Sequence, residues 1–165
     1  GTRMEHVARE AALSRQTIYR YVSGRDELVE LALLERCAEF AKQLRPDPDI
    51  DPSGLREAFV ELIVASVKIG RDDQEFRYLT EALPQSRLGP LNTSPDSPMH
   101  GVVWDTFAPL IEAGRAADLL RSEASDHDIV ECLQGVITFF APRHDLDDVA
   151  QRRRIRLFVL PALFS

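Results

Sequence analysis

The residues with the most distinctive chemistry lie close together, between positions 15 and 20. Arg15 and Arg20 can each hold guanine O6 and N7 with two hydrogen bonds, and Gln16 can do the same with adenine. The hydroxyl groups of Thr17 and Tyr19 are suited to phosphate oxygens. A helix with these side chains on its outer face could enter the major groove of DNA and contact base edges.

The surrounding residues predict the helix that would position this set. Ser14 can act as its N-cap, and Leu13, Ile18 and Val22 are expected to face inward. A further helix is predicted to follow from Ser23, with Arg25 in its first turn, where a cation and free N–H groups could hold one phosphate.

Another amphipathic helix is predicted just before this segment. Thr2 and Glu5 form a T-x-x-E capping box, in which each side chain accepts a hydrogen bond from the other residue's backbone. The apolar residues that follow recur at intervals of three and four, as on one helix face: Met4, Val7, Ala8 and Ala11. The three predicted helices together favour a helix-turn-helix.

The segment VAREAALSRQTIYRYVSGRDEL resembles the helix-turn-helix of the tetracycline-repressor-like (TetR) family of transcriptional regulators. The resemblance implies an all-α protein with a DNA-binding head and a helical body that binds a small molecule and forms a homodimer. It also implies a regulator, most often a repressor, that leaves its DNA operator when the effector binds. The residues that it assigns to DNA contact, including the usual helix cap, are Thr2, Arg15, Gln16, Thr17, Tyr19, Arg20, Tyr21 and Arg25.

Three features depart from the family pattern. Ala12 replaces the usual glycine of the turn, and we expect its φ to remain negative. Arg25 replaces the usual lysine and keeps its charge. The family's first helix would precede residue 2, so we expect the natural protein to have more residues upstream.

Charge is unevenly distributed along the chain. The net charge is −7, yet residues 1–25 contain five arginines and only two glutamates, so the N-terminal part alone is attractive to phosphate. Cys37 and Cys132 lie far apart within apolar patterns and form no metal-binding spacing. We expect packed thiols, no cofactor or metal, no membrane association, and a cytoplasmic protein.

The chain divides into a head with its connecting helix at residues 1–45 and a body at residues 46–165. The connecting helix should end before Pro46, and body helices should follow Ser53 and occupy residues 72–83. Residues 84–99 contain four prolines and are predicted to be an exposed loop. Further helices should cover residues 102–111, with a kink at Pro109, and begin near Asp126 and Asp147.

Two sets of body residues are candidates for binding, although the same residues would also make an ordinary core. Arg77 or Thr80 could add polar contacts to an effector pocket. The candidate pocket residues are Phe59, Ile63, Tyr78, Trp104 and Phe107. The candidate dimer residues, on the last two helices, are Leu133, Val136, Ile137, Phe140, Ile155, Phe158 and Val159.

Two other classes of protein remain as alternatives. The dipeptides His127-Asp128 and His144-Asp145 are compatible with a helical metal-dependent hydrolase. Each pair, however, is predicted at a helix start, where an aspartate caps and a histidine is exposed. The second alternative is an interaction-only helical dimer whose head does not bind DNA.

Overall fold

The computed structural model describes residues 4–47 and 50–165 and forms helices without strands in these ranges, which confirms the all-α prediction. The α-helices are α1 (Met4–Glu10), α2 (Arg15–Tyr19), α3 (Arg25–Leu44), α4 (Leu55–Asp72), α5 (Gln74–Ala82), α6 (Gln85–Thr93), α7 (Pro98–Ala116), α8 (Asp126–Phe140), α9 (Asp148–Arg154) and α10 (Leu160–Leu163). A 3₁₀ turn, η1 (Pro52–Gly54), precedes α4, and a π-helical turn, η2 (Ile155–Val159), joins α9 to α10.

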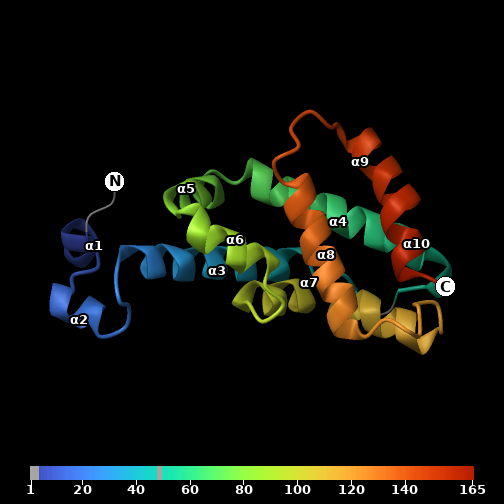
Figure 1. The fold of residues 1–165 in the computed structure, drawn as a ribbon, viewed down its shortest axis with the longest axis horizontal. Coiled ribbons are helices and arrows are strands. Elements are labelled where there is room, and N and C mark those ends of the chain that lie inside the picture. The colour runs from blue at the N-terminus through green and yellow to red at the C-terminus, as the bar shows by residue number, and fades with distance from the viewer. Residues whose placement is uncertain (1–3, 48–49) are drawn as a thin grey trace.

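The helices form an elongated molecule with α1 and α2 at one end (Figure 1). These two helices and the start of α3 enclose a small apolar cluster of their own: Met4, Val7, Ala8, Ile18, Val22 and Leu28. We call residues 4–24 the head and residues 50–165 the body. The long helix α3 runs from the head along the body, where it packs against α5 and α7 (Figure 1).

The body has two apolar clusters. The larger one joins α4, α7, α8 and the C-terminal helices, and Phe59 and Phe107 stack at its centre with a centroid distance of 6.2 Å. The smaller one joins α3 to α5, α6 and the start of α7 around Leu33 and Leu91. Because α3 contributes to the smaller cluster, the head is anchored to the body through that cluster.

The prediction of an exposed loop at residues 84–99 is wrong. Residues 85–93 form α6, and α7 already begins at Pro98. Leu91 is buried and Leu88 is half-buried against the smaller cluster, so apolar burial outweighs the backbone hydrogen bond that Pro90 cannot make. Pro98 occupies the first turn of α7, where a missing N–H costs nothing.

Helix α7 also continues past the predicted end at residue 111, through Gly114 to Ala116. A Cβ atom at Gly114 would lie 2.7 Å from Cγ of Leu120 and 3.2 Å from Cδ2 of Leu55. Gly114 therefore allows the segment after α7 to pack directly against the helix, and it does not end the helix.

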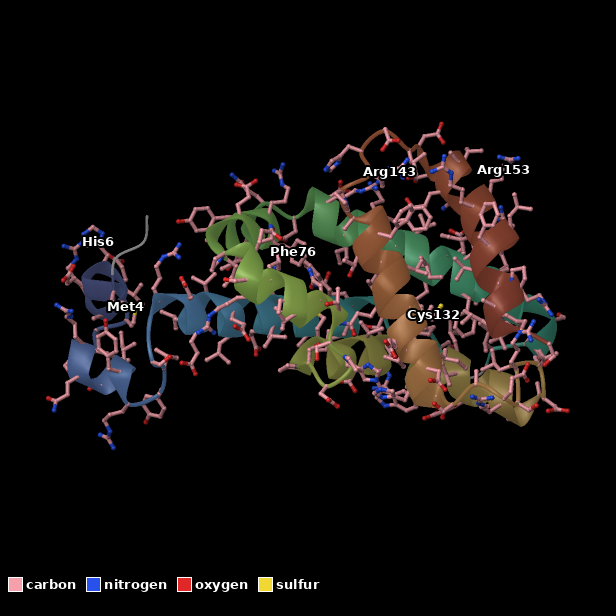
Figure 2. The ribbon with its side chains drawn as sticks, viewed as in Figure 1. Met4, His6, Phe76, Cys132, Arg143 and Arg153 are labelled. Carbon is pink, nitrogen blue, oxygen red and sulfur yellow. The ribbon has the colours of Figure 1, made fainter. Side chains whose placement is uncertain are left out.

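Arginines hold the C-terminal helices against α4. Arg152 donates to both carboxylate oxygens of Glu61 at 2.7 and 2.8 Å, and Arg156 donates to Glu57. Arg152 and Arg156 thus pair with carboxylates of α4, whereas Arg153 is exposed and projects from α9 (Figure 2).

Candidate nucleic-acid interface and ligand cavity

Helix α2 has one packed side and one open side. Ile18 and the following Val22 are buried in the head cluster, at 7% and 4% exposure. Thr17 is half-buried, and the remaining candidate residues from this segment are exposed: Arg15, Gln16, Tyr19, Arg20 and Tyr21. The body leaves the open side of α2 uncovered at the end of the molecule (Figure 1).

Ser14 begins α2 as predicted. Its Oγ accepts from the backbone N–H of Thr17 at 3.0 Å and lies 2.8 Å from the Thr17 hydroxyl. This cap fixes the first turn, which carries Arg15 and Gln16.

The turn between α1 and α2 differs from expectation at Ala12, whose φ is 53° and not negative. The N–H of Ala12 donates to Arg9 O at 3.1 Å, and the N–H of Leu13 donates to Ala8 O at 2.9 Å. These two bonds form a Schellman motif, which requires a left-handed residue at the position of Ala12. Ala12 thus adopts a left-handed backbone conformation that glycine usually occupies.

Arg15 and Arg25 have different surroundings. Arg15 makes a 2.9 Å ion pair with Glu5, and both side chains are more than half exposed. Arg25 instead donates to Asp26 at 2.9 Å and to the carbonyl of Ala82, at the end of α5, at 3.0 Å. The expected phosphate contact of Arg25 therefore competes with its hydrogen bond to Ala82 of the body. Thr2, the other expected contact residue near the chain start, lies outside the described residues.

The start of α3 also differs in detail from the prediction. Gly24 is the N-cap, and the N–H of Ser23 donates to the Glu27 carboxylate at 2.6 Å. The hydrogen bonds from Ser23 lower the pKa of Glu27. The capping partner of Ser23 is therefore Glu27.

A cavity of about 620 Å³ lies between α3 and the body, lined by residues from α3, α4, α5, α6, α7 and α8 and from the segment after α8. Its wall is mainly apolar and includes Phe40 and Phe76, whose ring centroids are 5.6 Å apart. Phe76 lies on α5, beside α3 (Figure 2). Exposed lining residues such as Arg77 and Glu81 open the cavity to solvent.

Only one of the five candidate pocket residues, Phe107, lines this cavity. Phe59 and Ile63 are fully buried in the larger apolar cluster, and Trp104 packs against that cluster. Tyr78 is 57% exposed on α5. The expected polar residues Arg77 and Thr80 do line the cavity. Sequence reasoning missed the contribution of α3, because it treated that helix only as a connector.

Cys37 is one of the α3 residues that line the cavity. Burial raises the pKa of its thiol to about 12. The group is therefore a packed, protonated thiol at neutral pH, as the sequence suggested.

The seven candidate dimer residues fall into three groups. Leu133, Phe140, Ile155 and Val159 are buried in the core of the monomer. Ile137 lines the cavity. Val136 and Phe158, by contrast, line a shallow apolar groove between α8 and η2, together with Cys132, Gly135, Phe139, Phe140, Arg154 and Val159.

The π-helical turn contributes an exposed apolar side chain, Phe158, to this groove. Ile155 and Val159 are both buried, whereas Leu157 and Phe158 between them are 51% and 74% exposed. Phe139 of α8 is also 55% exposed, so apolar rings project from both sides of the groove.

The two His-Asp pairs are engaged locally. Asp128 accepts from the N–H of Ser125 at 2.8 Å as part of a capping box, and the Arg143 guanidinium lowers the pKa of Asp145 to about 2. The ring of His127 packs against that of His100 in a tilted arrangement, with a centroid distance of 4.3 Å. Within residues 4–47 and 50–165, no group of three His, Cys, Asp or Glu side chains is placed to hold a metal ion.

A scan against protein-family models and searches against curated proteins and solved structures found no match. In the part of the chain that the structure describes, no helix has both the length and the apolar character needed to cross a bilayer.

Proposed function

We propose that this protein is a DNA-binding transcriptional regulator in which α2 contacts base edges and the body cavity binds a small effector. The observation that carries the proposal is the open side of α2, where Arg15, Gln16 and Arg20 are exposed on a helix packed only by its other side. These are the residue types that make bidentate contacts with guanine and adenine. Arginine enrichment in residues 1–25 of an otherwise acidic chain supports the same partner.

The ion pair of Arg15 is compatible with this role. A pair between exposed side chains contributes at most about 1 kcal/mol. Arg15 can therefore exchange Glu5 for a base or a phosphate at little cost. In the free protein, Glu5 keeps the guanidinium close to the first turn of α2.

Two contacts support a link between the cavity and the head. Helix α5 contributes Phe76, Arg77, Thr80 and Glu81 to the cavity wall, and its last residue, Ala82, accepts a hydrogen bond from Arg25. Arg25 is the first residue of α3, which follows the head directly. In the proposed mechanism, an effector that shifts α5 changes this contact and the position of α2, which releases DNA and relieves repression.

The proposed regulator acts as a homodimer. The groove residues Val136, Phe139 and Phe158 form an apolar surface on α8 and η2, and a two-fold axis would place this surface against its own copy. Such a dimer presents two α2 helices, and productive binding needs half-sites about 34–36 Å apart. A cytoplasmic location is part of the same proposal, because the DNA is there.

The test is a salt-titrated binding assay on the DNA upstream of the protein's own gene, which compares wild type with an Arg15→Ala/Arg20→Ala variant. Loss of one bidentate contact costs about 1–3 kcal/mol, so we expect the variant to lose about a hundredfold in affinity and its sequence preference. Residual binding should weaken steeply with salt.

An Arg45→Ala/Arg153→Ala variant is the matched control. It removes the same charge from exposed positions outside the head, and it should keep the sequence preference. Wild type without specific binding at any salt, or an unchanged preference in the α2 variant, would overturn the proposal and leave the interaction-only dimer.

A further inference from the structure

The polar groups in the cavity wall define what kind of molecule it can hold. Among the described residues of the wall, the buried polar ones are Thr106 and Gln134, at 6% and 4% exposure. The Thr106 hydroxyl donates its proton to Val102 O at 2.9 Å, and the half-buried Ser66 hydroxyl donates to Leu62 O at 2.7 Å. Each of these hydroxyls has only lone pairs left to offer a ligand.

The cavity lacks an available cation in its interior. Arg71, the half-buried cation among the residues that line the cavity, donates to the carbonyls of Phe140, Ala141 and Arg143 at the end of α8. Arg77 and His144 lie at the exposed edge. A carboxylate or phosphate bound deep in the cavity would thus lose its hydration without gaining a counter-charge.

Gln134 of α8 contributes a buried polar atom that has no hydrogen-bond partner. Its Nε2 donates to Leu91 O at 3.2 Å, and Ser97 Oγ lies 3.5 Å from the same nitrogen. Because Leu91 O can only accept, this contact fixes the orientation of the amide. The other end of the amide, Oε1, is buried without a hydrogen-bond partner.

A buried carbonyl oxygen without a partner costs about 1–3 kcal/mol, which a ligand can recover by donating a hydrogen bond. We propose that the cavity binds a neutral, mainly apolar molecule whose hydroxyl or N–H group donates to Oε1 of Gln134. This inference rests on the proposed use of the cavity as the effector site. The half-buried Asn92 and Thr138 can donate or accept, so they are compatible with further neutral polar groups.

The experiment is a calorimetric titration of the full chain, without DNA, with three biphenyls that differ in one substituent. These are 4-phenylphenol, 4-methylbiphenyl and biphenyl-4-carboxylate. We expect the phenol to bind about tenfold more tightly than the methyl compound, and the carboxylate to bind most weakly.

Two glutamine variants test whether Gln134 causes the preference for the phenol over the methyl compound. Gln134→Leu should reduce the advantage of the phenol over the methyl compound to within about twofold. Gln151→Leu makes the same change at the other buried glutamine, which is 1% exposed and lies outside the cavity wall, and it should keep the tenfold preference. Circular dichroism and thermal unfolding establish that each variant is folded.

A second measurement needs no variant. In ¹⁵N-labelled wild type, the side-chain amide resonances of Gln134 should shift on addition of the phenol and move much less with the methyl compound. Equal affinities for these two compounds, an unchanged preference in Gln134→Leu, tightest binding of the carboxylate, or no phenol binding up to its solubility limit would each overturn the inference.

These outcomes are separable from the DNA test. If the protein prefers the phenol through Gln134 but never binds DNA, the inferred ligand class stands and the proposed function is rejected. If the protein binds DNA specifically but lacks the phenol preference, the proposed DNA function stands and the inferred ligand class is rejected.

Discussion

Ala12 holds a φ of 53° in the turn before α2, a conformation that costs an L-residue about 1–2 kcal/mol. The Schellman hydrogen bonds from Ala12 and Leu13 require this conformation. The turn that orients α2 therefore contains backbone strain, because a methyl group stands where glycine is favoured.

Replacing Ala12 with glycine should relieve this strain. Part of the gain is offset by the greater flexibility of glycine in the unfolded chain, so we expect a net stabilisation of the head of about 0.5–1 kcal/mol. Amide hydrogen exchange should slow in α1 and α2. The neighbouring Ala11→Gly, where φ is not positive, is the control and should give faster exchange. Faster exchange in Ala12→Gly as well would contradict the argument.

Cys37 gives a second prediction at this scale, because its thiol lies in the cavity wall with a pKa raised by burial to about 12. In a Cys132→Ser variant, labelling of Cys37 by a thiol reagent should be slow at pH 8 and accelerate about tenfold per pH unit up to pH 10, since the thiolate is the reactive form. Denaturant should abolish this protection. Rapid labelling of the folded protein at pH 8 would show that the cavity does not bury this residue.

At the scale of elements, the close packing of α7 against the segment that contains Leu120 depends on Gly114. The positions of Leu120 and Leu55 leave no space for a methyl group on this face of α7. The same helix contains Gly101, around which a Cβ would meet no atom within 4 Å. The two glycines of α7 thus have opposite structural roles.

Alanine substitutions should separate these roles in urea unfolding. Gly114→Ala should lower the free energy of unfolding by about 1–3 kcal/mol through overpacking against Leu120. Gly101→Ala should raise it by about 0.5–1 kcal/mol, because alanine restricts the unfolded backbone. Equal effects of the two substitutions would mean that the segment around Leu120 can move aside.

The elements differ in how far the sequence predicts them. Capping residues and apolar periodicity predicted α3 close to its observed bounds, with Gly24 as N-cap in place of Ser23, and Ser14 correctly predicted the start of α2. Helix α6 was missed because Gly89 and Pro90 are local signals against a helix, whereas burial of Leu91 against α3 depends on tertiary contacts.

The same limit applies to the candidate sites. Exposure of Arg15 and Arg20 follows from the inward spacing of Ile18 and Val22, which local periodicity predicted. The same prediction was wrong for Leu13, which precedes the helix and is 49% exposed. The cavity is formed where α3 meets helices that follow it much later in the chain, and periodicity cannot show which apolar residues border a cavity and which fill the core. Phe59 and Phe107 have the same residue type and similar burial, yet only Phe107 lines the cavity.

At the scale of the whole molecule, the head and the body have separate apolar clusters, and the exposed apolar groove lies on the body. The proposed DNA contact and the proposed dimer contact therefore use different surfaces. Changes in one surface should leave the folding of the other intact.

Phe158→Glu tests the dimer surface. Phe158 is 74% exposed and lines the groove, so a carboxylate there should favour the monomer, as measured by sedimentation equilibrium. Val149→Glu is the matched control, since Val149 is 76% exposed and lies outside the groove. We expect the control to remain dimeric. A dimer that persists in Phe158→Glu would locate the contact elsewhere.

The length of α3 has a mechanical consequence. Its 20 residues span about 30 Å, so a tilt of about 5° around its body end moves its head end by about 2.6 Å. Such a displacement approaches the length of a hydrogen bond. In the proposed regulator, this helix would act as a lever: a rotation too small to disturb side-chain packing around the cavity would separate α2 from the bases it contacts, while the head keeps its internal structure.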